Sequence, residues 1–296
     1  MEAKLESRIA QMGDKLLELL ERGDILPWRE EWSLSGGGGY VNVATGRPYS
    51  GQNVILLWID RCCNRYSSTY YVGFYQAKDL GLRMLKGSKS CPILYPRFAK
   101  RVNEEGEEVK VLVGWSWANV FNLDCFEDTE EKRAILAKYM EDADDTSKFT
   151  APEFVDFMLE THKPNLIFDP TRTPCYIPNS DKVVMPPIEQ FNSPEGFAAT
   201  LIHELAHWTG HKSRLNRKQV GFANCPKSYA FEELVAEMAS AIVCAEYGLG
   251  YALEKHASYL QHWIDLLQKQ KTTFVAALKE AAKASEFLTR KTPEEE

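Results

Sequence analysis

The chain has 296 residues, of which 44% are hydrophobic, so it can bury a substantial core and form about two domains. No apolar run approaches the roughly 18 residues of a membrane span, and the first residues lack the apolar core of a signal peptide. Seven cysteines without a Cys-x-x-Cys pair indicate neither a disulfide framework nor a cysteine zinc site. We therefore expect a globular, cytoplasmic protein with no membrane partner.

The net charge of −7 hides a basic region between residues 40 and 102, where ten Lys and Arg stand against two Asp, a local net charge of +8. Aromatic residues alternate with these cations. Such a mixture suits single-stranded DNA, because cations follow the phosphates and exposed rings stack on unpaired bases. Aromatic residues more often fill a core, so composition alone leaves both interpretations open. The candidate DNA contacts are Trp28, Arg29, Arg47, Tyr49, Arg83, Lys86 and Lys89.

The first half of the chain predicts an α+β domain. Apolar residues recur at helical spacing over 5–20, and the four glycines at 36–39 predict a loop that either closes over DNA or is a plain surface loop. Residues 53–60 predict a buried helix, whereas 91–102 and 109–121 predict two strands joined by an acidic turn. We expect this single-stranded DNA-binding domain to span 1–127.

An acidic segment at 128–150 has little to bury and predicts a linker. A second, mainly helical domain is expected at 151–296. It contains a predicted hairpin formed by residues 173–177 and 181–185, and the chain is expected to be helical after Tyr251.

Residues 203–207 have the sequence His-Glu-Leu-Ala-His inside a predicted helix, which Ser193 can cap and Gly210 can end. The i, i+4 spacing puts both imidazoles on one helix face, close enough to share a metal ion. Glu204 lies beside them, where a general base could deprotonate a metal-bound water. Ordinary surface histidines on a polar helix face are the alternative. The pattern favours metal-assisted hydrolysis, most often of a peptide bond.

A third ligand is expected further along the chain. His211 lies too far along the helix axis to share one metal with His203 and His207 while the helix continues, and the metzincin spacing would require a histidine where the chain has Ser213. Glu233 and Glu237 share a face of the next predicted helix. We expect Glu233 to ligate the metal, Glu237 to hold a ligating imidazole, and Glu232 to point elsewhere. Ordinary surface glutamates are again the alternative.

Two His and one Glu leave one coordination position open for water, as in catalytic zinc sites. We expect one zinc ion per chain, with manganese or another divalent metal as the alternative. Tyr229 or His211 is the candidate for contacting the substrate or the oxyanion. Residues 182–185 are expected to align an extended substrate by strand addition.

Several longer motifs point to one family. They are Gly23 followed by Pro27-Trp28-Arg29, residues 42–53, Lys86-Gly87-Ser88, residues 120–123, 203–211, 213–216 and 229–237. Over nearly its whole length the chain thereby resembles the ArdC antirestriction family of conjugative plasmids and the related amino-terminal regions of plasmid primases. It departs from the family pattern at Asp124-Cys125, where a Gln is usual.

The resemblance implies an amino-terminal single-stranded DNA-binding domain followed by a zincin-like metallopeptidase domain. It also implies a role in protecting incoming plasmid DNA, in the cytoplasm of a bacterial recipient cell, with a protein of the host restriction machinery as the candidate substrate. The alternative is a non-enzymatic DNA-binding shield with a structural metal. A DNA-cleaving metal hydrolase is disfavoured, because nucleases usually hold paired metals in carboxylate-rich sites.

The basic, aromatic-rich region generates the first prediction. Residues 1–127 should bind single-stranded DNA more tightly than duplex, with an affinity that falls with salt at a log–log slope of about −0.7 per neutralised phosphate. Neutralising Lys86 and Lys89 together should flatten that slope, as measured by binding titrations at several salt concentrations. Equal affinity for the two forms of DNA would contradict the prediction.

Overall fold

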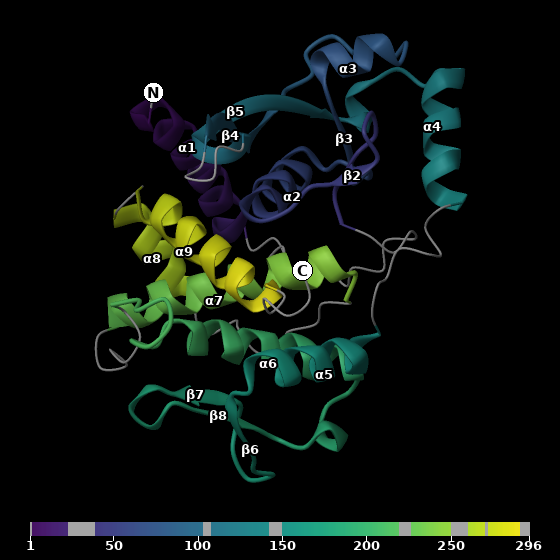
Figure 1. Cartoon of the computed structure of the whole chain (residues 1–296). Coiled ribbons are helices and arrows are strands. Elements are labelled where there is room, and N and C mark those ends of the chain that lie inside the picture. Colours follow the sequence, from purple (N-terminus) through teal and green to yellow (C-terminus); the bar gives the residue numbers. More distant parts are fainter. Residues whose placement is uncertain are drawn as a thin grey trace.

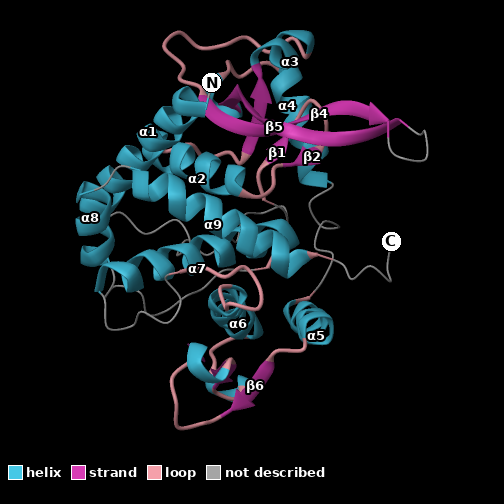
Figure 2. Ribbon diagram, turned by 60° about the vertical axis from the view of Figure 1, so that its left-hand side comes forward, coloured by secondary structure: helices cyan, strands magenta, loops and turns pink. Residues whose placement is uncertain are grey.

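The computed structural model describes residues 2–22, 39–102, 108–141, 150–218, 226–249, 260–269 and 272–290. Within these ranges the chain forms one mixed sheet near the amino terminus, a smaller sheet in the second half, and a layer of helices between them (Figures 1 and 2). The α+β class expected from the sequence is confirmed. Trp28, Arg29, the glycines at 36–38 and residues 103–107 of the acidic turn lie outside the described residues.

The first half contains a five-stranded sheet with the strand order β2-β1-β3-β5-β4. The predicted first helix, the buried helix and the two long strands are all present. The elements are α1 (Glu2–Glu21), β1 (Val41–Asn42), β2 (Arg47–Pro48), α2 (Gln52–Asn64), β3 (Tyr70–Gly73), α3 (Phe74–Asp79), β4 (Cys91–Val102) and β5 (Glu108–Asn122).

The position of helix α2 explains its apolar sequence, because other elements cover it on more than one side. It contacts β4 of the sheet as well as helices α1, α7 and α9, and every residue from Val54 to Asp60 is buried (Figure 1). The buried Asp60 accepts a hydrogen bond from the Tyr71 hydroxyl at 3.2 Å and lies 3.7 Å from the Lys15 ammonium. A buried carboxylate needs such partners to offset its desolvation.

Helix α4 (Glu130–Glu141) occupies part of the segment expected to be an acidic linker at 128–150. The Tyr139 hydroxyl donates to the Val43 carbonyl at 3.1 Å, and its ring lies 5.2 Å from that of Tyr70. Ile135, Leu136 and Tyr139 recur at helical spacing and pack against buried residues of the first half. The linker prediction is therefore wrong over α4, because three apolar side chains on one face offset the acidic composition. Residues 142–149 lie outside the described ranges.

The second half has a three-stranded sheet of order β6-β8-β7 below the helices. The predicted hairpin is present, since β7 pairs antiparallel with β8. Strand β8 also pairs with β6, so both of its edges are occupied and the predicted strand addition at 182–185 is wrong. The elements are α5 (Ala151–His162), β6 (Asn165–Phe168), β7 (Cys175–Ile177), β8 (Lys182–Met185), α6 (Pro194–Thr209), α7 (Pro226–Tyr247), α8 (Leu260–Lys269) and α9 (Thr272–Thr289).

One hydrophobic cluster runs through both halves of the chain. Helix α1 packs against α8 and α9, and α2 packs against α7 and α9. The contact between α1 and α9 is close, because a Cβ atom added at Gly13 would lie 2.9 Å from the Cβ of Phe274. The two regions therefore share a core, and the DNA-binding test above is better made on the full chain. Among the described residues, no helix combines the length and apolarity needed to cross a membrane.

The close contact at Gly13 generates a stability prediction. Replacing a glycine by alanine inside a helix ordinarily stabilises a protein by up to about 1 kcal/mol. Gly13→Ala should instead lower the free energy of unfolding by about 1–3 kcal/mol, because the new methyl group overlaps the buried Phe274 side chain. Chemical denaturation measures the change. Ser7→Ala, on an exposed position of the same helix, is the control and should be neutral or slightly stabilising. A stabilised Gly13→Ala variant would show that α1 and α9 are not in close contact.

Candidate metal centre

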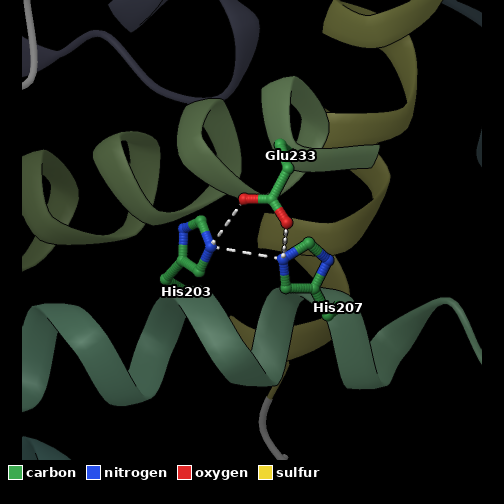
Figure 3. A group of neighbouring side chains, drawn as sticks. All are labelled: His203, His207 and Glu233. Carbon is green, nitrogen blue, oxygen red and sulfur yellow. Dashed lines mark hydrogen bonds and ion pairs between the residues drawn. The ribbon is translucent and has the colours of Figure 1, made fainter. Parts of the chain in front are cut away.

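Helix α6 presents the His-Glu-x-x-His residues to helix α7. The Ser193 hydroxyl accepts a hydrogen bond from the Gly196 amide at 3.0 Å, Pro194 occupies the first turn, and Gly210 follows the last turn, as the sequence predicts. His203 and His207 lie one turn apart on the same face, and both point at Glu233 of α7 (Figure 3).

The three predicted ligands converge on one point. The Nε2 atoms of His203 and His207 are 3.2 Å apart, and each lies 3.5 Å from one carboxylate oxygen of Glu233. Two ligands bound tetrahedrally at about 2.0–2.1 Å from a metal ion lie about 3.3 Å from each other. The spacing of these three buried donor atoms therefore fits a single divalent ion.

A further carboxylate contacts the Nδ1 atom of each imidazole, on the side away from Glu233. The Nδ1 atom of His203 lies 3.1 Å from Glu237, as expected from the sequence, and the Nδ1 atom of His207 lies 3.4 Å from Glu232. The expectation that Glu232 points away from the site is wrong. Its position on the helix directs it away from Glu233, but α7 runs alongside α6, so consecutive glutamates reach opposite nitrogens of the same imidazole. Carboxylates in these positions fix the tautomer and orientation of a ligating histidine.

Glu232 is itself fixed by Arg217, which lies in the segment after α6. The Arg217 side chain is almost fully buried and pairs with both carboxylate oxygens of Glu232. Its remaining donors reach the Thr209 hydroxyl at 2.8 Å and the Ala206 carbonyl at 2.7 Å. Every polar end of this buried pair is thus hydrogen-bonded, which a buried ion pair requires. Arg217 was not predicted from the sequence, because a single Arg in a loop carries no spacing signal.

The pKa values follow from this packing. Burial disfavours a charged imidazole, but Glu233 and Glu232 raise the pKa of His207 to about 9. Glu233 and Glu237 likewise raise the pKa of His203 well above its usual range, against the effect of burial. Burial would raise the pKa of Glu233, but the two imidazoles lower it well below its usual range. The carboxylates therefore favour charged imidazoles, and binding of a metal ion would require the ligating nitrogens to release their protons.

Glu204 is buried beside the two histidines at 7% exposure. Burial raises its pKa, the two imidazoles lower it, and it accepts a hydrogen bond from the Tyr176 backbone amide of β7. The carboxylate is thereby tied to the edge strand of the small sheet. A glutamate in this position can accept a proton from a group bound between the histidines and β7.

His211 and Tyr229 are the two residues predicted to contact a substrate or an oxyanion. His211 contacts the Ser213 hydroxyl at 2.8 Å and lies 3.9 Å from Asp181, in the turn after α6. Tyr229 is half-buried on α7, four residues before Glu233. His211 is not among the three convergent donors. Contact with a substrate or an oxyanion stays a prediction for both.

A second network of polar contacts, which the sequence did not predict, joins the turn after α6 to the β7–β8 hairpin. The Arg214 guanidinium pairs with Asp181 and lies 3.7 Å over the Trp208 ring. The Tyr176 hydroxyl donates to the same carboxylate at 2.8 Å. These contacts fix β7, and with it the hydrogen bond to Glu204, against the metal helix.

The predicted DNA contacts are spread over the first half. Arg47 lies exposed on β2, and Arg83, Lys86 and Lys89 lie exposed in the segment between α3 and β4. Tyr49 is partly buried against the core, and its hydroxyl accepts a hydrogen bond from the Asn42 amide at 3.1 Å. Its ring is therefore a packing residue more than an open stacking surface. The binding roles of these residues stay predictions, and Trp28 and Arg29 lie outside the described residues.

Comparison with known proteins agrees with this geometry. Residues 7–140 match the family described as the N-terminal domain of anti-restriction factor ArdC, and residues 155–280 match a family described as zincin-like metallopeptidase. The metal-free crystal structure of ArdC from plasmid R388 is 33% identical with a TM-score of 0.69. The Mn(II)-bound structure is 31% identical with a TM-score of 0.68. Each alignment covers 95% of this chain and 96% of ArdC.

Two curated proteins are also similar. DNA primase TraC of Escherichia coli is 29% identical over 292 residues, which cover 94% of this chain and 26% of TraC. The uncharacterized protein y4eC of Sinorhizobium fredii is 27% identical over 267 residues, or 86% of this chain and 81% of y4eC. The chain thus spans about a quarter of the length of TraC.

The fold and the convergent His, His and Glu side chains define the class, which is a protein with an ArdC-type amino-terminal domain followed by a zincin-like metallopeptidase domain. The similarity to ArdC covers almost all of both chains. The chain belongs to the ArdC antirestriction family.

The donor geometry generates a prediction for metal content. Substituting His203 or Glu233 by Ala should largely empty the site, because each removes one of three ligands. Glu237→Ala and Glu232→Ala should each lower metal affinity about 10- to 100-fold, since each frees a ligating imidazole from its carboxylate. Glu204→Gln should leave occupancy nearly unchanged. Elemental analysis and metal titration of the purified variants measure these effects.

Full occupancy in Glu233→Ala, combined with an empty site in Glu232→Ala or Glu237→Ala, would assign the third ligand to a different glutamate. The matched control is Glu189→Ala, which removes an exposed glutamate that is not one of the three donors and should bind metal normally.

Proposed function

We propose that this protein protects incoming plasmid DNA from restriction by combining a single-stranded DNA-binding region with a zinc-dependent peptidase centre. The observation that carries the proposal is the buried convergence of His203, His207 and Glu233 beside Glu204. The ArdC relatives and the zincin-like family match support the two-part organisation. The proposed substrate is a protein of the host restriction machinery.

His203, His207 and Glu233 would hold one divalent ion, and the existence of an Mn(II)-bound structure of the related ArdC supports binding of a divalent metal. Zinc is the proposed metal, because it suits a site of two imidazoles and one carboxylate. When bound, the ion supplies Lewis acidity toward a substrate carbonyl and a lowered pKa for water. Glu237 and Glu232, the latter through Arg217, keep the imidazole rings oriented.

Glu204 would act as the general base, because its buried carboxylate adjoins both imidazoles and is held by the β7 backbone. A proton accepted there can then pass to the leaving amine. Among the described residues β7 is an edge strand of its sheet, so its unpaired side is proposed to line a substrate path beside Glu204. In this proposal the α7 carboxylates set the ligand geometry while Glu204 moves the proton.

DNA binding is proposed for the first half of the chain. The local charge of +8 between residues 40 and 102 supports this proposal. The candidate contacts Arg47, Arg83, Lys86 and Lys89 lie in this region, and all four are exposed. An electrostatic contact of this kind is independent of base sequence. The proposed partner is plasmid DNA in its single-stranded form during conjugation, as the ArdC relatives suggest, and binding should show no strong sequence preference.

Replacing Glu204 by Gln separates the peptidase from a non-enzymatic shield. The substitution keeps the size of the side chain and removes the base, so metal content and DNA affinity should stay normal. A plasmid encoding Glu204→Gln should transfer into a restricting recipient no better than a plasmid lacking the gene, and transfer into a non-restricting recipient should be unchanged.

The control for this experiment is Glu189→Gln, the same chemical change at an exposed glutamate that is not one of the three donors. It should protect the plasmid as the unmodified protein does. Full protection by Glu204→Gln with normal metal content would instead support a DNA-binding shield whose metal site is structural.

A further inference from the structure

Strands β4 and β5 form a two-stranded arm that runs beyond the rest of the first sheet (Figure 2). Strand β3 pairs with β5 only at Val120, Phe121 and Asn122, so the outer part of the ribbon has no further strand on either side among the described residues. Outer side chains on both faces of this ribbon are largely exposed. The arm therefore offers a surface that the protein's own core does not use.

The arm carries large apolar side chains in the open. Phe98 is 57% exposed, Trp115 is 47% exposed and Tyr95 is 44% exposed. Side chains alternate along β4, so Phe98 lies on the same face of the ribbon as Pro96. Pro96 pairs with Trp115, and the rings of Phe98 and Trp115 therefore share this face. Exposed aromatic residues gathered in this way usually mark a binding surface.

Cations continue the same face. Lys100 and Lys110 stand directly opposite each other in the ladder, an arrangement that is destabilising unless an anion lies nearby. Glu108 is the one acidic residue in the described parts of the two strands, and it pairs with Lys100 at 2.7 Å. Arg97 and Arg101 lie exposed on the other face. The charge of the described ribbon is thus complementary to a polyanion.

The backbone of the arm disfavours a partner that adds a strand. β4 is the edge strand, and Pro92 and Pro96 lack the amide hydrogens that strand addition needs. A ligand that uses the side chains, with rings for flat groups and ammonium groups for phosphates, suits the surface better. Single-stranded nucleic acid presents both of these groups at every nucleotide.

We infer that the β4–β5 ribbon is the single-stranded DNA-binding platform of this protein, with Phe98 and Trp115 stacking on unpaired bases and Lys100 and Lys110 contacting phosphates. This inference rests on the proposed DNA binding and assigns it to residues other than those expected from the sequence. The turn at 103–107 contains three glutamates and lies outside the described residues, and no contact is assigned to it.

The test measures binding of the full chain to a labelled oligothymidine of about 20 nucleotides by fluorescence anisotropy. Phe98→Ala with Trp115→Ala should raise Kd about 30-fold or more, the loss expected when two bases lose their stacking partners. The matched control is Phe74→Ala with Tyr75→Ala, which removes a second exposed aromatic pair, on α3, and should leave Kd within about twofold. Thermal unfolding should show all variants folded, because these side chains are exposed.

Charge variants give an independent readout. Lys100→Gln with Lys110→Gln should reduce the log–log salt slope by about 1.4, since each phosphate contact contributes about 0.7. Unchanged affinity and slope in both ribbon variants, with normal binding by the parent protein, would overturn the assignment of the platform and leave the proposed function intact. Loss of binding in the α3 pair instead would also overturn it.

A parent protein that does not bind the oligonucleotide would overturn the proposed DNA binding itself. Light scattering on the same samples shows whether a second copy of this protein binds to the ribbon. A change of oligomeric state in the Phe98 and Trp115 variant, without a change in DNA affinity, would assign the ribbon to self-association.

Discussion

The site depends on one packing contact, in which helix α6 places two imidazoles one turn apart and helix α7 faces them with carboxylates. Burying any one of these side chains in its charged form without a partner would cost several kcal/mol of desolvation free energy. Together they satisfy one another, since Glu233 faces both Nε2 atoms while Glu237 and Glu232 face the two Nδ1 atoms. The relative position of the two helices therefore fixes the donor geometry, and the surrounding apolar core fixes the helices.

The supporting contacts extend outward from this pair of helices in two directions. Arg217 ties the segment after α6 to Glu232, and Arg214 ties the same segment to Asp181 of the hairpin. The first contact orients an imidazole, and the second holds β7, whose backbone bonds Glu204. Two arginines three residues apart thus connect one short turn to both the ligands and the candidate base.

The sequence predicted those parts of the protein that follow from regular spacing. The i, i+4 pair on α6 and the Glu-x-x-x-Glu face on α7 follow from helical periodicity, and both appear in the structure as expected. Glu232, Arg217 and the central place of β8 depend on how separate elements pack, which periodicity does not contain. Helix α4 was missed because acidic composition masked its three apolar residues, and Tyr49 because an aromatic residue gives no sign of its burial.

The shared core has a consequence for how the chain is made. Helix α1 buries its apolar face against α8 and α9, which are synthesised more than two hundred residues later. During translation the apolar face of α1 therefore emerges uncovered. The amino-terminal half cannot complete its packing until α9 leaves the ribosome. Such long-range contacts slow folding and leave apolar surface open to aggregation or to chaperones in the interval.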